Sequence, residues 1–329
     1  MFINLLRAGS RRVRTGVVLA ALIASAGIAF AQANYPSQPI RLVVGFAAGG
    51  PSDILARVAS SAMSKTLGSQ IFVENRTGAS GNIATEIVAH AEPDGYTLLL
   101  ATISQPVNET LFKDFPYRGA TNFTMIASMV QTGLVLLVNP ELNVKSVQDL
   151  ITLAKAKPGE VLYATAGKGT ATHLAAELFN EAAGVKMTPV HYRGGGETLK
   201  DLLSGQVKVM FSTLPPVLDL IKQGKLRGIA TTGLQRDKSL PDLPTIAEVA
   251  IPGYEVQLWS GLSAPKGTPK PIIDKLADAA SKSLDDPETL KVLDQQGYTP
   301  KYLGPAEFEK FYASEVTKWS KVANAIGPD

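Results

Sequence analysis

The amino-acid sequence predicts an α/β fold in which mainly parallel sheets are covered by helices on both faces. Short apolar runs typical of strands alternate with longer stretches of helical periodicity through residues 40 to 231. Small residues are concentrated in two of the strand-to-helix turns, Phe46 to Ser52 and Ala166 to Thr170. In the carboxyl-terminal third, the pattern changes to helices interrupted by Pro and Gly. Repeated strand–helix–strand units favour parallel neighbours, because a parallel pair needs a crossover connection.

The expected elements follow in order along the chain. Strands are expected at Ile40 to Val44, Gln70 to Val73, Thr97 to Ala101, Leu134 to Val138, Val161 to Tyr163, Thr188 to Tyr192, Val207 to Phe211 and Arg227 to Thr231. Helices are expected at Ser52 to Leu67, Asn82 to His90, Ser146 to Lys155, Ala171 to Ala182, Glu197 to Leu203 and Leu214 to Lys222. The last third adds helices at Pro271 to Leu284, Pro287 to Gln296 and Pro305 to Ala325.

Composition limits the classes of function. The chain has 329 residues, enough for two domains with a buried core, and it contains no cysteine. Disulfides, thiolate metal sites and a cysteine nucleophile are therefore excluded. Residues 1–33 hold four basic and no acidic residues, so the remaining chain is nearly neutral, with 28 basic and 29 acidic residues. A nucleic-acid-binding or polybasic membrane surface is not predicted.

The two glycine-bearing turns are the most informative segments. In IRLVVGFAAGGPSDILARVASSAM and in VLYATAGKGTATHLAAELF, a strand leads through small residues into a helix. The first N–H groups of a helix lack partners and the helix dipole adds positive potential there, so such a start attracts carboxylate or phosphate. A purely structural role fits as well, because α/β chains commonly reverse at glycine. Neither turn carries a complete phosphate-binding motif.

The segment from Tyr35 to Thr102, with the strings VENRTGASGN and PDGYTLL, resembles the opening of the Bug family, also called TctC-like. Further similar strings follow in the order of the family: KPGEVLYATAGKGTATHLAAELF, HYRGGGETLKDLLSGQVKVMF, GKLRGIATTG, LPDLPTIAEVAIPGYE and WSGLSAPKGTP. Members are periplasmic solute-binding proteins of tripartite tricarboxylate transporters. The resemblance therefore implies a protein that captures a small organic carboxylate and delivers it to the membrane subunits of such a transporter.

The resemblance also implies the type II periplasmic-binding-protein fold, in which two lobes enclose a ligand cleft. Residues 34–131 and about 254–329 would form lobe 1, and about 132–253 would form lobe 2 with the return hinge. We expect the chain to cross between the lobes near Gln131 to Leu134 and to return between Thr231 and Tyr254. The two glycine-bearing turns would then face each other across the cleft, at the carboxyl ends of strands.

In this family the two turns hold the ligand through backbone amides, hydroxyls and bridging waters. The resemblance transfers this role to Phe46, Ala47, Ala48, Gly49, Gly50, Ser52 and Asp53 in one lobe, and to Ala166, Gly167, Gly169, Thr170, Thr172 and His173 in the other. Further candidates near the cleft are Thr102, Ser104, Tyr192 and Ser212.

Several of these candidates have a structural alternative. Hydroxyls at Ser52, Thr170 and Thr172 are equally expected to cap helices. Asp53 stands four residues before Arg57 and can form an ion pair with it. A role in bracing the loop, by bonding a neighbouring carbonyl, is expected more strongly for His173 than ligand contact. The ring of Tyr192 either stacks on the ligand or closes the core.

The sequence leaves the ligand open among dicarboxylates, citrate-like tricarboxylates, nicotinate and aromatic acids. Ser212 and Thr213 follow Phe211 where many relatives carry an acidic residue, a natural partner for a ligand ammonium. An amino-acid ligand is therefore less expected, and Lys168 in the second turn adds to the preference for an anion.

Catalysis is not expected. Gly78 to Gly81 has the wrong spacing for G-x-S-x-G, and Ser263 to Lys266, an S-x-x-K, contains a proline. The three histidines show no metal-ligand spacing. We therefore expect no catalytic residue, no metal and no cofactor. A periplasmic hydrolase is the weaker alternative, and a ligand-loaded partner of a sensor kinase is a further one.

The amino terminus predicts a cleaved signal peptide and a periplasmic location. Four arginines precede an uncharged run, Thr15 to Phe30, which ends in two overlapping A-x-A sites. We expect the exported protein to begin at Gln32 or Asn34, which intact-mass measurement of periplasmic protein checks. A mass that still includes Arg11 and Arg12 would contradict this reading.

Overall fold

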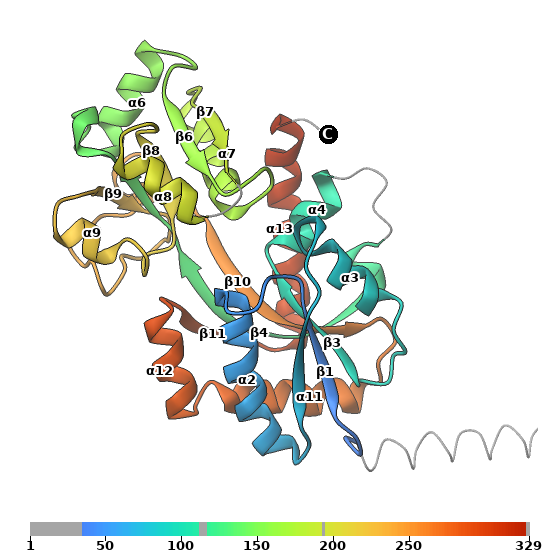
Figure 1. Cartoon of the computed structure of the whole chain (residues 1–329). Coiled ribbons are helices and arrows are strands. Elements are labelled where there is room, and N and C mark those ends of the chain that lie inside the picture. The colour runs from blue at the N-terminus through green and yellow to red at the C-terminus, as the bar shows by residue number, and fades with distance from the viewer. Residues whose placement is uncertain (1–34, 112–116, 193–194, 327–329) are drawn as a thin grey trace, which may run out of the picture.

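The computed structural model describes residues 35–111, 117–192 and 195–326, which form two lobes, each built on one β-sheet with flanking helices (Figure 1). The expected signal peptide, residues 1–33, lies outside the described residues. Among the described residues, no helix is long and apolar enough to cross a membrane.

The first sheet has six strands in the order β11-β4-β10-β3-β1-β2. Their bounds are β1 Ile40–Val44, β2 Ile71–Asn75, β3 Thr97–Thr102, β4 Phe123–Gly133, β10 Gln257–Pro265 and β11 Thr299–Leu303. Strand β1 pairs in parallel with β2 and β3, whereas β10 is antiparallel to β3 and β4, and β11 is antiparallel to β4. Both ends of the described chain therefore contribute to one lobe.

The second sheet has five strands in the order β7-β6-β8-β5-β9. Their bounds are β5 Val135–Val138, β6 Leu162–Thr165, β7 Thr188–His191, β8 Val209–Ser212 and β9 Arg227–Thr231. Strand β6 pairs in parallel with β7 and β8, and β5 is antiparallel to β8 and β9. The carboxyl ends of β6, β7 and β8 therefore lie at one edge of this sheet.

The α/β class and the two-lobe arrangement are confirmed, but both sheets are mixed, which corrects the expectation of mainly parallel sheets. Strands β4, β10 and β11 were not expected from the sequence. In β10, QLWSGLSAP, serine, glycine and proline weaken the strand signal. Antiparallel pairing arises where long strands run toward the other lobe and back, without a helical crossover between them.

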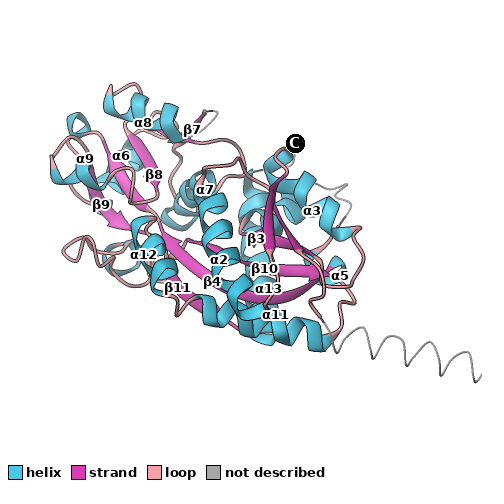
Figure 2. Ribbon diagram, turned by 60° about the horizontal axis from the view of Figure 1, so that its bottom comes forward, coloured by secondary structure: helices cyan, strands magenta, loops and turns pink. Residues whose placement is uncertain are grey.

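The helices cover the sheets on both sides (Figure 2). Those of the first lobe are α2 Pro51–Leu67, α3 Asn82–Ala89, α4 Ser104–Leu111, α5 Gly119–Asn122, α11 Lys270–Ser283, α12 Pro287–Gln295 and α13 Pro305–Ile326. Those of the second are α6 Val147–Ala156, α7 Ala171–Ala183, α8 Gly195–Leu203, α9 Leu218–Lys222 and α10 Ile246–Val249. Two short 3₁₀ turns complete the list, Ala79–Gly81 before α3 and Pro140–Leu142 before α6. Capping residues in the sequence explain where several helices begin. For example, Ser146 and Asp149 form a capping box on α6.

Strand β1 contributes side chains to two apolar layers. Its Leu42 and Val44 belong to one buried cluster with residues of α2 and α11, whereas Val43 belongs to another cluster with residues of α3, α4 and α13. Because successive side chains of a strand point to opposite faces, this nearly continuous apolar strand matches a sheet that is covered on both sides.

Helix α13 is attached to β10 by one buried carboxylate. An oxygen of Glu315 accepts hydrogen bonds from the indole N–H of Trp259 at 3.0 Å and of Trp319 at 2.9 Å. The ring of Trp259 also meets Phe308 and Tyr312 edge-on. Buried indole N–H groups need such a partner, so the carboxylate fixes the last helix to the sheet.

The chain passes from the first sheet to the second through one residue, Leu134, between β4 and β5. It returns after β9, and Thr232 holds the two passages together. The N–H of Leu134 donates to the Thr232 hydroxyl at 2.7 Å, and this hydroxyl donates to the carbonyl of Val256 at 2.7 Å. Backbone bonds join the same three residues, from Thr232 to Leu134 and from Val256 to Thr232.

Replacing this hydroxyl should weaken the crossing. Thr232→Val keeps the shape of the side chain but leaves the N–H of Leu134 and the carbonyl of Val256 without their side-chain partner in a buried site. We expect the free energy of unfolding to fall by about 1–3 kcal/mol, measured by urea titration. The control Thr232→Ser keeps the hydroxyl and should lose clearly less. Equal losses in both variants would contradict this role.

Candidate functional site

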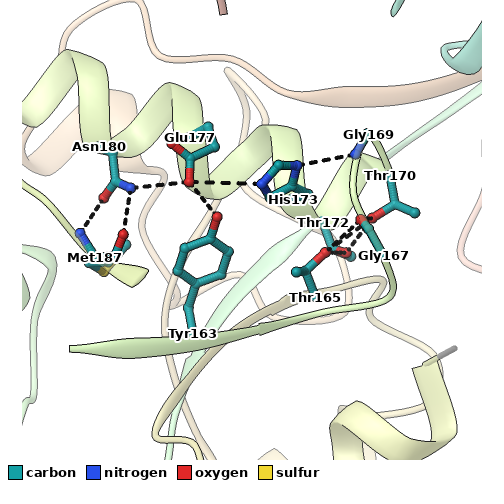
Figure 3. A network of polar contacts seen from close by, with 10 residues as sticks. All are labelled: Tyr163, Thr165, Gly167, Gly169, Thr170, Thr172, His173, Glu177, Asn180 and Met187. Atoms are coloured by element: carbon teal, nitrogen blue, oxygen red, sulfur yellow. Dashed lines mark hydrogen bonds and ion pairs between the residues drawn. The ribbon is translucent and has the colours of Figure 1, made fainter. Parts of the chain in front are cut away.

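Three threonines organise the turn between β6 and α7 (Figure 3). The hydroxyls of Thr165, Thr170 and Thr172 lie within 3.1 Å of one another. Thr170 also donates to the carbonyl of Gly167 at 2.7 Å, and Thr172 accepts from the N–H of Ala166 at 3.2 Å. The turn is therefore held in one conformation by its own side chains, before any ligand is considered.

His173 braces the same turn from the first turn of α7. Its Nδ1 accepts the N–H of Gly169 at 3.1 Å, so the ring proton of the neutral form lies on Nε2, which is 3.9 Å from Glu177 Oε1. The side chain is buried, and burial lowers the pKa of His173 to about 4, with the nearby charges of His191 and Lys168 as further causes. The expected bracing role is seen, but the bond is to an amide N–H and not to a carbonyl.

The network continues along α7 away from the turn. Glu177 accepts hydrogen bonds from the hydroxyl of Tyr163 on β6 and from Asn180 Nδ2 at 3.4 Å. Asn180 in turn exchanges two hydrogen bonds with the backbone of Met187 (Figure 3). One face of α7 is thus fixed to β6 and to the start of the next strand, which fixes the direction of the helix axis.

The turn between β1 and α2 has a comparable brace in Asp53. Its carboxylate accepts from the N–H of Gly49 at 2.8 Å, from Arg57 Nε at 2.9 Å and from Asn75 Nδ2 at 2.9 Å. The hydrogen bond from Arg57 is the main reason why the pKa of Asp53 is lowered to about 2. Asn75 also donates to the carbonyl of Phe46 at 3.0 Å. The expected pair of Asp53 with Arg57 is therefore present, and both carboxylate oxygens serve the turn itself.

Helix capping is only partly as expected. Helix α2 begins at Pro51, one residue earlier than expected, and Gly50 is its N-cap, so Ser52 is not the cap. Thr170 is the N-cap residue of α7, yet its hydroxyl binds within the turn and does not cap the helix. Thr172 lies inside the helix.

A cavity of about 320 Å³ opens at the carboxyl ends of β6 and β8. Hydroxyl-bearing residues in its lining are Thr165, Thr172, Thr198, Ser212 and Thr213. The other lining residues are Leu134, Ala164, Ala166, Gly196, Leu199, Met210, Phe211, Pro216 and Leu258. The first residues of α7 and α8 thus lie at one cavity, beside the passage between the lobes.

The structure brings three of the predicted residues to this cavity: Ala166, Thr172 and Ser212. The other candidates do not line it: Phe46, Ala47, Ala48, Gly49, Gly50, Ser52, Asp53, Thr102, Ser104, Gly167, Gly169, Thr170, His173 and Tyr192. The turn before α2 lies on the side of the first lobe that faces the second lobe (Figure 1). Ligand contact by this turn stays a prediction.

Two further groups of candidates have structural partners. The N–H and hydroxyl of Thr102 donate to Gln105 Oε1 at the start of α4, and the N–H of Ser104 donates to the Thr102 hydroxyl at 3.3 Å. The hydroxyl of Tyr192 donates to Asp201 at 2.8 Å, while its ring packs against the apolar core of the second lobe. These contacts favour the core-closing alternative for Tyr192.

Sequence reasoning missed several lining residues. Thr165 ends β6, Thr213 directly follows β8, and Thr198 lies in the first turn of α8. The rule that α/β sites lie at the carboxyl ends of parallel strands points to all three. No local signal identified Leu258, because it reaches the cavity from β10, a strand of the other sheet.

The electrostatics of the cavity come from backbone and not from charged side chains. None of the described residues that line it is ionisable. The helix dipoles of α7 and α8 add positive potential at their first turns. In the described part of the chain, no group of three His, Asp or Glu side chains is placed to hold a metal ion.

Two mixed α/β lobes, joined by two adjacent passages and carrying a cavity at the carboxyl ends of strands, define the class of periplasmic binding proteins. Within this class, a family model described as "Tripartite tricarboxylate transporter family receptor" matches residues 55–327. The chain belongs to this receptor family. Protein BugT of Bordetella pertussis is 35% identical over 314 residues, which cover 94% of this chain and 96% of BugT.

Solved structures of similar proteins agree. A periplasmic transporter structure is 38% identical, with a TM-score of 0.77, and the match covers 88% of this chain and 98% of that one. An R. palustris protein solved with adipate is 34% identical, with a TM-score of 0.77 and the same coverage. MatC of Rhodopseudomonas palustris, with bound malate, is 32% identical with a TM-score of 0.75, covering 88% of this chain and all of MatC.

The buried His173 should make stability depend on pH. Between pH 6.5 and about 4, the unfolded chain takes up a proton that the native protein does not, so stability falls as the pH falls through this window. We expect a loss of roughly 3 kcal/mol from this group, measured by urea unfolding at several pH values. In His173→Asn, an amide oxygen replaces Nδ1 as acceptor and this part of the pH dependence should vanish.

A histidine outside the site provides the control. His90 is exposed, and His90→Asn should keep the pH dependence of the unchanged protein. If His173→Asn shows the same pH profile as the unchanged protein, then protonation of His173 does not limit stability.

Proposed function

We propose that this chain is a periplasmic solute-binding receptor, made with a cleaved signal peptide. It captures a small carboxylate between its two lobes and delivers it to the membrane subunits of a tripartite tricarboxylate-type transporter. It acts by binding and carries out no chemical reaction. Membership of the receptor family supports the general role.

One observation carries the choice of a carboxylate. The first turns of α7 and α8 meet at a single cavity, and none of its described lining residues is ionisable. Helix starts of this kind bind anions through backbone N–H groups and the helix dipole. The braced turn before α7 supports this role, because preorganised donors need little reordering when the ligand arrives.

The turn before α2 would complete the site from the other lobe. It is braced by Asp53 as the opposite turn is braced by His173, and it lies on the facing side of the first lobe. A ligand that touches both turns favours the closed arrangement only through contacts made there, and the lobes would rotate about the passages next to Thr232.

The structures of similar proteins support the ligand class. Two of them contain adipate or malate, and both of these ligands are carboxylates. The transporter partner is inferred from the description of the family. A pull-down with the ligand-loaded protein distinguishes transporter subunits from a sensor kinase as the partner.

Binding should require the negative charge of the ligand. We expect calorimetry to detect carboxylates that bind, and to detect no binding of the corresponding primary amides, because the helix starts stabilise an anion. At a hundredfold excess over its dissociation constant, a bound acid should stabilise the protein by about 2.7 kcal/mol. Equal affinity for an acid and its amide would exclude this mechanism.

Thr213 offers a matched pair of variants, because it is part of the lining and only half-buried. Thr213→Glu adds a negative charge to an uncharged wall, while Thr213→Gln adds nearly the same volume without charge. The carboxylate should bind Thr213→Gln more tightly than Thr213→Glu, at equal melting temperature without ligand. The same affinity in both would argue for a site elsewhere.

A further inference from the structure

The lobes also touch at a point outside the two passages, where Gly297 of the first lobe meets Pro215 of the second. Gly297 lies between α12 and β11, and Pro215 lies between β8 and α9. A Cβ built on Gly297 would lie 2.8 Å from Cγ and 2.9 Å from Cδ of Pro215. Carbon atoms of different residues pack at roughly 3.5–4.0 Å, so no side chain fits here. Because glycine has no Cβ, the backbone of one lobe can lie directly against the proline ring of the other.

In the first lobe, Gly297 is fixed by the end of α12. This helix ends in a Schellman motif, in which the N–H of Gly297 donates to the carbonyl of Asp294 at 3.0 Å and the N–H of Tyr298 donates to that of Leu293 at 2.8 Å. Leu293 is buried in the core of the first lobe, and Tyr298 packs against the same core. Gly297 therefore cannot withdraw from the proline without disturbing the packing of its own lobe.

In the second lobe, Pro215 is fixed by the turn before α9. The carbonyl of Leu214 accepts the N–H of Val217 at 3.0 Å and that of Leu218 at 2.9 Å. Leu214 and Val217 are buried in the core of the second lobe, and the next residue, Pro216, lines the cavity. Since both partners are fixed within their own lobes, a side chain in place of the glycine would push the lobes apart.

The spacing of the lobes matters for binding, because the proposed site has a part in each of them. The cavity at the carboxyl ends of β6 and β8 belongs to the second lobe, and the turn before α2 belongs to the first. A ligand that touches both parts binds well only at the spacing that allows both sets of contacts. The glycine contact lies near the first passage, since Thr299 at the start of β11 pairs with Gln131 near the end of β4.

We propose that Gly297 is a positioning residue for ligand capture. Its contact with Pro215 sets how closely the lobes approach, and thereby places the turn before α2 at the distance from the cavity that binding requires. Gly297 does not line the cavity, so it acts on the ligand through this spacing. This inference rests on the proposed function and adds a residue outside the two binding turns.

The contact can be changed with a matched control. Gly297→Asn adds a side chain at the contact, and asparagine tolerates positive φ. Gly224 ends α9 in the same Schellman motif, its φ of 70° is close to the 69° of Gly297, and a Cβ there would meet nothing within 4 Å. Gly224→Asn is therefore the control. Pro215→Ala removes the ring atoms that the new side chain would meet, so combining it with Gly297→Asn should restore the spacing.

The spacing of the lobes is measured without ligand by electron paramagnetic resonance. The chain contains no cysteine, so Ser61→Cys on α2 and Lys155→Cys on α6 place one exposed spin label in each lobe. We expect a longer mean distance between the labels in Gly297→Asn than in Gly224→Asn or in the protein with neither change. The double variant should return to the shorter distance. An unaltered distance in folded Gly297→Asn would overturn the proposal.

The affinity is measured by calorimetry with adipate, malate, citrate, nicotinate and benzoate as probes. A probe that binds the unchanged protein should bind Gly297→Asn more weakly by about tenfold or more, and should bind Gly224→Asn and the double variant within about threefold of the unchanged protein. Melting temperatures check that the variants fold. If Gly297→Asn does not fold, Gly297→Ala and Gly224→Ala, which add the Cβ alone, replace the asparagine pair.

Failure of this inference and failure of the proposed function give different results. If a probe binds Gly297→Asn and Gly224→Asn with the same affinity, the receptor function stands and the positioning role of Gly297 falls, whatever the label distance. If none of these carboxylates binds to the folded, unchanged protein, the carboxylate-binding function itself falls, and the inference falls with it.

Discussion

The hydrogen bonds of Thr232, from its hydroxyl and from its backbone, join the two passages between the lobes. Two separate segments pass between the lobes, and this one side chain donates to one and accepts from the other. A hydroxyl is suited to this position because it is donor and acceptor at once. The two passages are thereby kept adjacent, so the lobes share one narrow axis, and a rotation of one lobe against the other needs dihedral changes at only a few residues.

The two turns before α2 and α7 are each fixed by hydrogen bonds from their own side chains. One turn is fixed by three threonine hydroxyls and a neutral histidine, and the other by a carboxylate with an unusually low pKa. Each brace satisfies a backbone N–H of its turn, that of Gly49 or that of Gly169.

The sequence predicted those parts of the fold that local patterns encode. Strands β1 and β9 begin and end at the expected residues, and β1 is a short, largely apolar run. Strand β10 was not predicted, since its serines and glycine are buried only through pairing with β3 and β4 on both sides. That pairing joins residues far apart in the chain, so no pattern of neighbouring residues in the sequence predicts it.

The same distinction applies to the candidate site. Thr172 was a candidate because the string that resembles the family, which contains it, is continuous in sequence. Leu258 was not, because it reaches the cavity only when the returning strand lies beside the second lobe. The pair of Asp53 with Arg57 was expected from their spacing, but the hydrogen bond from Asn75 was not, because it follows from the parallel pairing of β1 with β2.

The attachment of α13 to β10 has a consequence for spectroscopy. The chain contains two tryptophans, and both indoles bind the same carboxylate oxygen of Glu315. All tryptophan fluorescence therefore originates at one buried contact, and Trp259 is the direct neighbour of the cavity residue Leu258. The tryptophan emission of this protein therefore reports how α13 packs on β10. A ligand that leaves the surroundings of both indoles undisturbed does not change the tryptophan emission, however tightly it binds.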